Sequence, residues 1–319
     1  MVGVVAIICP LEVLFVMNLG TPGVDALMDS MAGAEIARFA RKIEKLGYSA
    51  LWFPEAFGRD PFALAAHLLT VTEKLIVGTA IANVWKREPV AMLSGARTLA
   101  ELFPGRFILG IGISHGPMMT RVGINYAKPL TFMRDYLARL KEAPYGAAPP
   151  TFEAPIIVAA LLPKMLKLAA AETDGTIPTF ITPERTAQIR AVIGPDKLIC
   201  MQQVSMLEKD ASKARTAIRG LIRFYLGLPN YLQSFRLMGF DDTDFANGGS
   251  DRLVDAMVAW GDEQAIRDRV AAQYKAGASH VCITPLRPEG SAGAWSLAAG
   301  GNRERATPEE RALEALAPQ

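Results

Sequence analysis

Short apolar runs alternate with longer amphipathic stretches along most of this chain of 319 residues. The runs have the length and composition of buried strands, and the stretches between them have the apolar spacing of helices that cover a sheet. Eight such runs occur, at residues 11–17, 50–53, 75–81, 106–112, 155–160, 175–180, 198–206 and 280–285. Eight strands that alternate with helices predict an α/β fold, a (β/α)8 TIM barrel.

The expected helices begin and end on residues that suit those positions. Thr182 followed by Pro183 is typical of a helix start, and Gly47 is typical of a helix end. The helices are expected at residues 34–47, 61–74, 88–103, 129–143, 163–173, 182–194 and 262–277.

One connection is much longer than the others, because residues 207–250 hold two or more helical stretches after the seventh strand. We interpret this segment as a helical insertion in the barrel. The chain is therefore expected to form one domain over residues 1–290. The remaining residues, 291–319, are rich in glycine, alanine and charge, and we expect a partly disordered tail.

The alternative architecture is an open, doubly wound sheet that binds a dinucleotide. Its fingerprint, G-x-G-x-x-G, lies between the first strand and the first helix. Here Gly110 and Gly112 follow the fourth strand, and the third glycine, Gly116, comes one residue too late. The pattern favours the barrel.

The first 18 residues are apolar enough to suggest a signal peptide or a membrane span. No basic segment precedes them, and Pro10 and Glu12 interrupt the run. We expect this run to be the first buried strand of the parallel sheet. Cys9, Cys200 and Cys282 lie in apolar runs without zinc spacing, which indicates reduced thiols and a cytoplasmic protein.

The charge pattern limits the partners. The chain has 34 basic and 32 acidic residues, a net charge of +2. Nucleic-acid-binding chains usually carry a basic face or stripe, whereas the basic residues around 209–215 are typical of a solvated helix face. We expect a small-molecule substrate and neither a nucleic acid nor a membrane as partner.

The stretch LGIGISHGP, residues 109–117, ends a buried run on two glycines, a serine and one of only three histidines. Functional groups of a barrel gather on the loops that follow its strands, so Ser114 and His115 are candidates. The loops after the other strands add Asn18, Glu55, Phe57, Asn83, Lys164 and Gln202.

These candidates include too few ligands for a catalytic metal, since only Glu55 and His115 could converge, and no metal is expected. No G-x-S-x-G nucleophile motif is present. Neutral polar groups with one carboxylate and one imidazole favour a largely neutral aromatic cofactor ring and one proton donor.

Several motifs resemble those of the bacterial luciferase-like superfamily, and most closely its deazaflavin (coenzyme F420)-dependent oxidoreductases. They are LGYSALWFPEAFGRDPF, IVGTAIANVWKREPVAMLSGARTLAELFPGRFILGIGISH and AALLPKMLKLAAAETDG, and the resemblance extends over residues 34–290. It implies a TIM barrel with an insertion after strand 7. It also implies hydride transfer between F420 and a small organic substrate, and a homodimer.

Two other functions stay open at this point. An FMN-dependent monooxygenase of the same superfamily would share the fold and most site residues. A non-catalytic barrel that binds a ligand is the third possibility, because the sequence departs from the family at two places. Ala56 replaces a catalytic histidine found in some deazaflavin enzymes, and Leu161-Leu162 replaces glycines that often receive the cofactor phosphate.

The resemblance also implies a set of cofactor-binding residues. A non-proline cis peptide at Thr79-Ala80, next to Ile81, is expected to press on the back of the ring, and Gly112 and Ser114 are expected to lie close to it. The phosphate is expected at the loop after strand 5 and the start of the next helix, which comprise Ala160, Leu161, Leu162, Pro163, Lys164 and Met165.

His115 and Glu55 are the residues that the resemblance implies for catalysis. An imidazole can donate or accept a proton near neutral pH. The substrate pocket is expected to include Asn18, Phe57, Asn83, Trp85 and Gln202.

Overall fold

The structure is a computed structural model that describes residues 4–7, 15–289 and 307–318. Eight parallel strands close a barrel, since the eighth strand pairs with the first and each other strand pairs with its neighbour along the chain. In order around the barrel they are β3 (Gly23–Asp25), β4 (Ala50–Phe53), β5 (Ile76–Thr79), β7 (Phe107–Gly112), β8 (Ile156–Val158), β9 (Gly175–Thr176), β10 (Leu198–Leu207) and β12 (His280–Leu286). A short strand, β6 (Ala82–Asn83), pairs with the end of β7. The chain is a (β/α)8 barrel, as the alternating pattern predicts.

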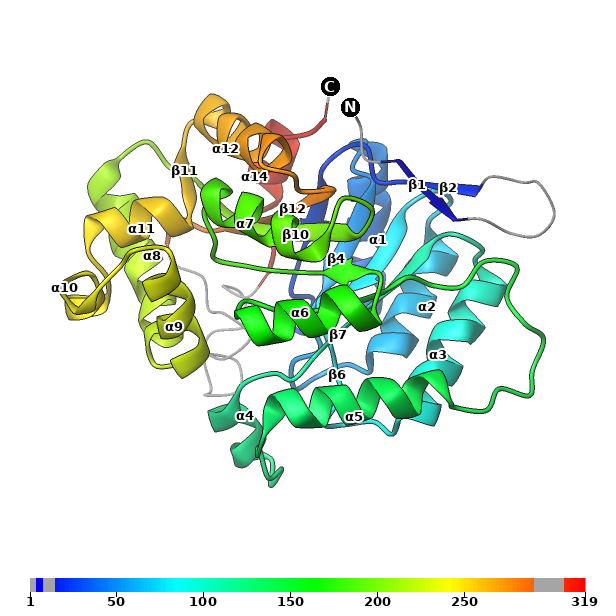
Figure 1. Cartoon of the computed structure of the whole chain (residues 1–319). Helices are drawn as coiled ribbons and strands as arrows, with labels where there is room; N and C mark the ends of the chain where they lie inside the picture. Colours follow the sequence, from blue (N-terminus) through cyan, green and yellow to red (C-terminus); the bar gives the residue numbers. More distant parts are fainter. Residues whose placement is uncertain (1–3, 8–14, 290–306, 319) are drawn as a thin grey trace.

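Helices surround the barrel on its outer side (Figure 1). They are α1 (Gly33–Lys45), α2 (Pro61–Val71), α3 (Pro89–Leu102), α4 (Gly116–Arg121), α5 (Pro129–Lys141), α6 (Pro163–Glu172), α7 (Pro183–Ile193) and α12 (Glu263–Lys275). Their starts follow local chemistry: the Asp60 side chain caps the first amides of α2, and Thr182 caps α7. Proline at the first helical position is a further start signal that both share.

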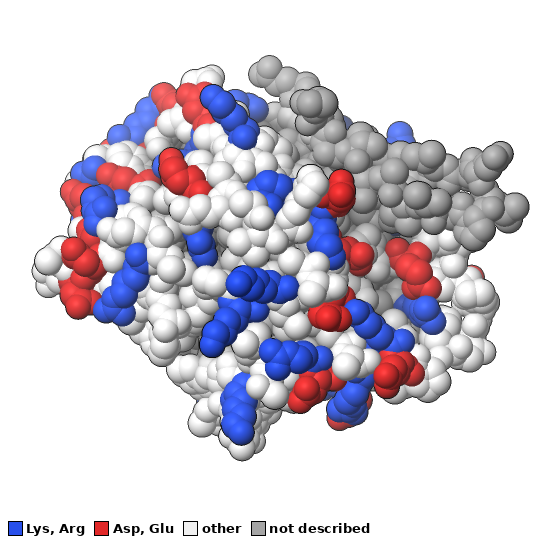
Figure 2. All heavy atoms as spheres, viewed as in Figure 1, with Lys and Arg blue, Asp and Glu red and all other residues white. Residues whose placement is uncertain are grey.

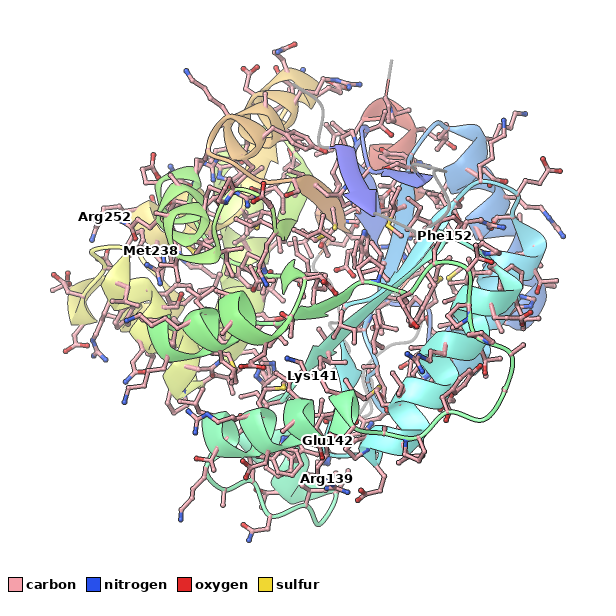
Figure 3. All side chains as sticks on the ribbon, turned by 45° about the vertical axis from the view of Figure 1, so that its right-hand side comes forward. Arg139, Lys141, Glu142, Phe152, Met238 and Arg252 are labelled. Atoms are coloured by element: carbon pink, nitrogen blue, oxygen red, sulfur yellow. The ribbon has the colours of Figure 1, made fainter. Side chains whose placement is uncertain are left out.

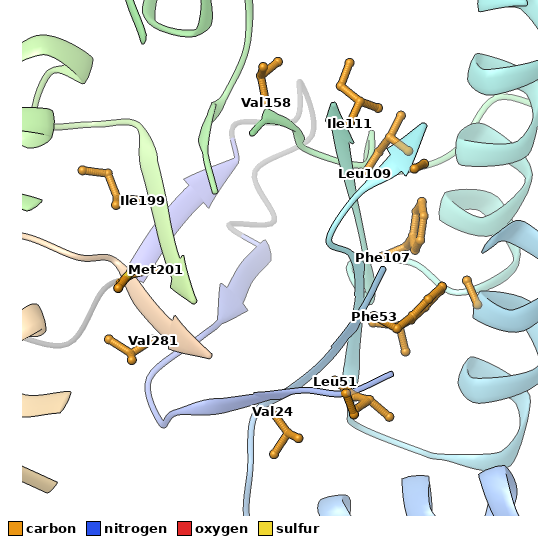
Figure 4. Packing of buried hydrophobic residues seen from close by; sticks show 14 of the residues in the cluster. Val24, Leu51, Phe53, Phe107, Leu109, Ile111, Val158, Ile199, Met201 and Val281 are labelled. Atoms are coloured by element: carbon orange, nitrogen blue, oxygen red, sulfur yellow. The ribbon is translucent and has the colours of Figure 1, made fainter. Parts of the chain in front are cut away.

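The barrel has two apolar layers because side chains along a strand alternate between its two faces. In β4, Leu51 and Phe53 pack in the layer between the strands and the helices, whereas Ala50 and Trp52 point into the barrel. Figure 4 shows Phe53 and Phe107 directed at the surrounding helices. Each fully buried side chain of this size contributes about 1.5–3 kcal/mol through removal from water, so the outer layer holds the helices on the barrel.

The N-terminal prediction is wrong. Residues 11–17 are not the first barrel strand: β1 (Val4–Ile7) and β2 (Phe15–Asn18) form an antiparallel pair of their own, and the barrel begins at β3. Met17 and Leu19 instead join the cluster inside the barrel. A short apolar run shows that a segment is buried but not what it pairs with.

The long connection between β10 and α12 is helical. It contains α8 (Ala211–Leu226), α9 (Pro229–Leu237), α10 (Asp242–Phe245), a 3-10 turn (Ala246–Gly248), α11 (Asp251–Met257) and β11 (Ala259–Gly261), which pairs with the end of β10. Ile218, Ile222 and Phe235 form a second apolar cluster there. Figure 3 shows Met238 and Arg252 of this connection at the left of the molecule, and Arg139 of α5 at its lower edge.

The structure describes residues 307–318 of the C-terminal segment, and the partly disordered tail expected over residues 291–319 stays a prediction. Residues 307–318 include α14 (Glu310–Ala315), which packs on α1: Glu310 pairs with Arg38 at 2.6 Å and with Lys42 at 2.7 Å. Leu313 is fully buried. The composition conceals the apolar spacing of this one helix, and residues 290–306 lie outside the described part.

The expected partners and compartment depend on the surface charge, on the length and hydropathy of the helices, and on the cysteines. Figure 2 shows basic and acidic side chains interspersed over the left and lower parts of one face. Within the described ranges, no helix is both long and apolar enough to cross a bilayer. Cys200 and Cys282 are buried free thiols, and Cys9 lies outside the described residues.

Candidate functional site

A cavity of about 1440 Å³ opens at the carboxyl ends of the barrel strands. Loops after most of the strands line it, and α8 and α9 of the long connection cover part of it. Its wall is largely apolar, with a few polar groups placed around it, as is typical of ligand sites. The polar lining residues used below are Asp25, Glu55, Ser114, His115, Lys164, Gln202, Arg236 and Thr284.

The two glycines at the end of β7 make room for a neighbouring segment of the protein. A Cβ at Gly110 would overlap the carbonyl oxygen of Thr79, and one at Gly112 would lie 2.7 Å from Cγ1 of Ile81. Thr79 in turn donates a hydrogen bond from its hydroxyl to the Gly110 carbonyl at 2.7 Å. Glycine allows this approach because it has no side chain. Ala80 and Ile81 thereby reach the cavity wall.

The cis peptide bond joins Ala80 and Ile81, one residue later than the expected Thr79-Ala80 bond. Thr79 is fully buried and does not line the cavity, and neither does Gly112. Both residues lie behind the wall, because alternate residues of a strand face opposite ways.

Glu55 is held by basic groups. Its Oε2 accepts hydrogen bonds from Arg87 Nη1 at 2.5 Å and from the Asn83 amide at 2.8 Å, and Lys86 lies 3.4 Å from Oε1. Its own amide donates to the Ile81 carbonyl at 3.1 Å, and its side chain is 4% exposed. A carboxylate paired in this way fixes the loop after β4 against the Ile81 segment. These contacts hold Glu55 in place, and its expected catalytic role stays a prediction.

His115 lies at the tip of β7, immediately before α4, and lines the cavity. Burial lowers its pKa to about 4, so the imidazole is neutral at pH 7. Tyr231 and Phe224 lie near the ring, with centroids at 5.7 and 6.4 Å. The preceding Ser114 has φ +53°, a conformation that non-glycine residues adopt rarely and that surrounding structure must enforce.

The start of α6 is suited to an anion. No side chain caps this helix, and its first residue is Pro163, so the amides of Lys164 and Met165 are the first donors of its N-terminus. Arg185 donates to the Leu161 carbonyl at 3.0 Å and holds the loop. All six residues expected there, Ala160 to Met165, line the cavity. Arg236 of α9 also lines the cavity and pairs with Asp242 at 2.5 Å.

Asp25 and Thr284 are cavity residues that the sequence predictions missed. Asp25 ends β3 and is 8% exposed. The Thr284 hydroxyl donates to its Oδ2 at 3.0 Å, and its Oδ1 has no hydrogen-bond partner. Burial raises the pKa of Asp25 to about 7, against smaller opposite effects of Thr284 and Gln202. Asp25 was missed because the first barrel strand was predicted at residues 11–17. The sequence signal for it is the short run Gly23–Asp25, which ends in a carboxylate.

Of the expected substrate residues, Gln202 lines the cavity, whereas Phe57, Asn83 and Trp85 do not. Trp85 instead stacks on Phe132, with ring centroids 3.6 Å apart, and Asn83 is buried with its amide 3.2 Å from the Met119 sulfur. Phe57 is 37% exposed and lies beneath Lys86. Asn18 ends β2 of the N-terminal pair, so it does not follow a barrel strand. These residues were predicted to line the substrate pocket because each follows a predicted strand. The chain after those strands runs in a different direction from the one that the prediction assumes.

No group of three or more potential metal-ligating side chains gathers within the ranges that the structure describes. The polar groups of the cavity come from several elements: Lys164 lies at the start of α6, Asp25 ends β3 and His115 follows β7. The arrangement can hold a planar, partly anionic molecule against an apolar surface. It can also orient a second, smaller molecule beside His115 and Asp25.

A family model described as luciferase-like monooxygenase matches residues 14–280. Among curated proteins, the 5,10-methylenetetrahydromethanopterin reductase of Methanolobus tindarius is 25% identical over 279 residues, covering 79% of this chain and 83% of the relative. The F420-dependent glucose-6-phosphate dehydrogenase of Kineococcus radiotolerans is 30% identical over 131 residues, 38% of each chain.

Among solved structures, the coenzyme F420-dependent tetrahydromethanopterin reductase of Methanopyrus kandleri superposes with a TM-score of 0.69. The match covers 92% of this chain and 97% of the other at 18% identity. At that identity the likeness shows the fold, and it agrees with the barrel described above.

Proposed function

This chain belongs to the luciferase-like monooxygenase family, and on that premise we propose that it is an oxidoreductase that transfers a hydride between coenzyme F420 and a small organic substrate. One relative, which matches 79% of this chain, is a reductase. Another, which matches 38% of it, is an F420-dependent dehydrogenase. These names support the cofactor class, and the substrate is left to experiment.

The observation that carries this proposal is the combination of two features in one cavity. The wall formed by Ala80 and Ile81 is apolar, and the uncapped start of α6 with Lys164 offers donors and positive charge. A cofactor with a planar ring and a phosphate on its side chain fits both features. The residues present therefore suit a deazaflavin.

The bound cofactor would supply or accept the hydride at its ring. Ile81 would pack against the ring, with Gly112 and Thr79 supporting the segment from behind. Lys164 and the amides of α6 would bind the phosphate, and Glu55 would hold the Ile81 segment in place. His115, neutral at pH 7, would hydrogen bond to the substrate or the ring rather than act as an imidazolium acid.

An FMN-dependent monooxygenase is the second candidate, since the matching family is described as luciferase-like monooxygenase. FMN also combines a planar ring with a phosphate, so the same wall and helix start would hold it. A non-catalytic barrel would bind neither cofactor.

Parallel titrations of the purified protein with F420 and with FMN, followed by fluorescence, test the proposal. We expect the tighter binding for F420. Lys164→Ala should weaken that binding about 10-fold, because one charge-assisted contact is worth about 1.5 kcal/mol.

Lys167→Ala is the matched control, because this exposed lysine lies one helical turn further along α6 and outside the cavity. It should leave the affinity unchanged. Tighter binding of FMN would favour the monooxygenase, and binding of neither would favour the non-catalytic barrel. The homodimer that the resemblance implies stays a prediction, which light scattering in solution would check.

A further inference from the structure

We propose that the cavity contains a separate aromatic subsite, formed by Phe180, Tyr225 and Tyr231 beside His115, and that the substrate it binds is an uncharged aromatic compound. That its ligand is the substrate rests on the hydride transfer proposed above. All four side chains line the cavity. Phe180 follows β9, Tyr225 lies in the last turn of α8, and Tyr231 lies in the first turn of α9.

The three rings of the subsite are in contact with one another. The ring centroids of Phe180 and Tyr225 are 4.4 Å apart, and those of Tyr225 and Tyr231 are 4.6 Å apart. The planes of these two pairs are tilted by 49° and 59°. The ring of His115 comes next, with its centroid 5.7 Å from that of Tyr231. Tilted rings offer both faces and edges, and aromatic rings favour offset and edge-to-face contacts at these distances.

The backbone holds Phe180 in a conformation that the surrounding structure must enforce. Its φ is +51°, a value that non-glycine residues adopt rarely. The next residue, Ile181, accepts a hydrogen bond from Gln273 Nε2 at 3.2 Å, and Gln273 Oε1 accepts one from the Thr186 hydroxyl at 2.6 Å. Gln273 and Thr186 are fully buried. Because this buried network fixes the loop, the Phe180 ring is a preformed part of the cavity wall.

The cavity has room for a second molecule besides a cofactor. Its volume is about 1440 Å³, whereas a site for one small ligand usually measures about 300–1,000 Å³. The features that suit the cofactor are the wall at Ile81 and the start of α6. The aromatic subsite comes from other elements, so its ligand has a wall of its own.

The elements that form the subsite favour an uncharged ligand. The described lining residues of α8, α9 and the loop after β9 include one charged side chain, Arg236, which pairs with Asp242 at 2.5 Å. Burial raises the pKa of Tyr231 well above its usual value, so its hydroxyl stays uncharged. A charged ligand would lose water here without a free counter-charge to replace it, which is unfavourable.

His115 connects the subsite with the wall that suits the cofactor. It follows β7, whose Gly112 lies against Ile81. Its neutral imidazole can donate or accept a hydrogen bond. An aromatic ligand that lies on Tyr225 and Tyr231 and directs a polar group to His115 is therefore brought toward that wall.

Calorimetric titration of the purified protein tests the subsite directly. The probes are matching isomers of naphthol and of its saturated analogue decalol, which share a carbon skeleton and one hydroxyl group. Naphthol should bind about 10-fold more tightly, because contacts between aromatic rings add to the effect of burial. Equal affinities, or tighter binding of decalol, would overturn the proposal.

Tyr225→Leu and Phe180→Leu locate the effect. Each keeps an apolar side chain and removes one ring, so the preference for naphthol should fall to about threefold or less while the affinity for decalol changes little. A merely structural role would change both affinities together and leave their ratio unaltered. Full preference in either variant contradicts the assignment of that ring to the subsite.

Tyr145→Leu is the matched control. This half-buried tyrosine lies outside the cavity, with its ring centroid 5.3 Å from the Arg97 guanidinium. The variant should keep the full preference for naphthol. Loss of the preference in Tyr145→Leu would show that the ratio does not report on the cavity, and it would overturn the proposal.

Naphthoate tests the charge of the ligand. The titration uses Lys164→Ala, which removes the cation at the start of α6. Naphthoate should bind at least about 10-fold more weakly than naphthol, because the carboxylate loses water in an apolar part of the cavity. Equal or tighter binding of naphthoate would overturn the uncharged class.

Saturation with F420 distinguishes this inference from the proposed function. With F420 bound, naphthol should keep its affinity to within about threefold, because the two molecules occupy different walls. Loss of naphthol binding would assign the aromatic rings to the cofactor and overturn the separate subsite. Absence of F420 binding would remove the proposed function, whereas the ratio of naphthol to decalol affinity would still decide whether the aromatic subsite exists.

Discussion

The two ends of the barrel contain histidines with equally lowered pKa values but opposite surroundings. At the amino-terminal end, His280 is fully buried, its Nδ1 donates to the Leu19 carbonyl at 3.3 Å, and its Nε2 accepts from the Trp52 indole at 3.1 Å. At the carboxyl end, His115 lines the cavity beside aromatic side chains. Burial lowers both pKa values to about 4.

The comparison teaches that a shifted pKa does not by itself mark a functional group. His280 has both ring nitrogens occupied by the protein, and Gly23 provides the space for its ring. The amino-terminal end is therefore a satisfied core. The carboxyl end instead keeps Asp25 Oδ1 without a partner and Ser114 at a positive φ, features that persist where a ligand is to be met.

The largest expected effect on stability is that of a substitution at His280, at the amino-terminal end of the barrel. His280→Ala should lower the free energy of unfolding by about 3 kcal/mol or more, because it leaves a cavity and two buried groups without partners. Urea unfolding monitored by circular dichroism measures this loss. Cofactor affinity of the folded fraction should stay unchanged; a specific loss of affinity would mean that the two ends are not independent.

His115→Ala should show the reverse pattern. Turnover should fall about 100-fold because a hydrogen-bond donor to the reacting group is lost, while the cofactor dissociation constant changes less than about threefold. Steady-state kinetics together with fluorescence titration separate these quantities. An unchanged rate would assign His115 to the cavity wall only.

Lowering the pH should show how the titration of His115 affects the free energy of unfolding. Its folded-state pKa of about 4 lies below the unfolded value of 6.5, so the unfolded chain binds a proton that the folded chain excludes. This contribution is present above pH 6.5 and is lost as pH falls toward 4. Between pH 7 and pH 5 the unmodified protein should lose about 2 kcal/mol more stability than His115→Gln. Equal losses would show that the imidazole is solvated.

The titration of Asp25 should change the free energy of unfolding with pH in the opposite direction and by a similar amount. Its folded-state pKa of about 7 lies above the unfolded value of 3.8, so its contribution is full below pH 3.8 and is lost as pH rises toward 7. Relative to Asp25→Asn, the unmodified protein should therefore lose about 2 kcal/mol between pH 5 and pH 7. Denaturant unfolding at the two pH values checks the sign, and a parallel pH profile for both proteins would contradict it.

Most of the barrel was predictable because its signals are local. The strand at residues 50–53 coincides with β4, and the helices expected at 61–74 and 182–194 begin within one residue of α2 and α7. Apolar runs, helix caps and prolines favour a strand or helix through residues that are close in the sequence, so the sequence alone reveals them.

The candidate site was predictable where it depends on strand ends and not where it depends on packing. His115 and Lys164 follow long, clear strands or open a helix, and both line the cavity. Trp85 and Asn83 also follow a strand, but the chain turns them away from the cavity. Asp25 ends a strand of three residues, which is too short to give a periodic signal.

By itself, the order of apolar runs, caps and glycines determined an eight-stranded barrel and the edge at which its functional groups would gather. Only the tertiary structure decided which of those groups face the cavity, which of the two buried histidines lines it, and that Asp25 is among its acidic groups. The reason is physical: strand and helix signals are set by neighbours along the chain, whereas exposure, pairing and pKa are set by residues that folding brings together from distant segments.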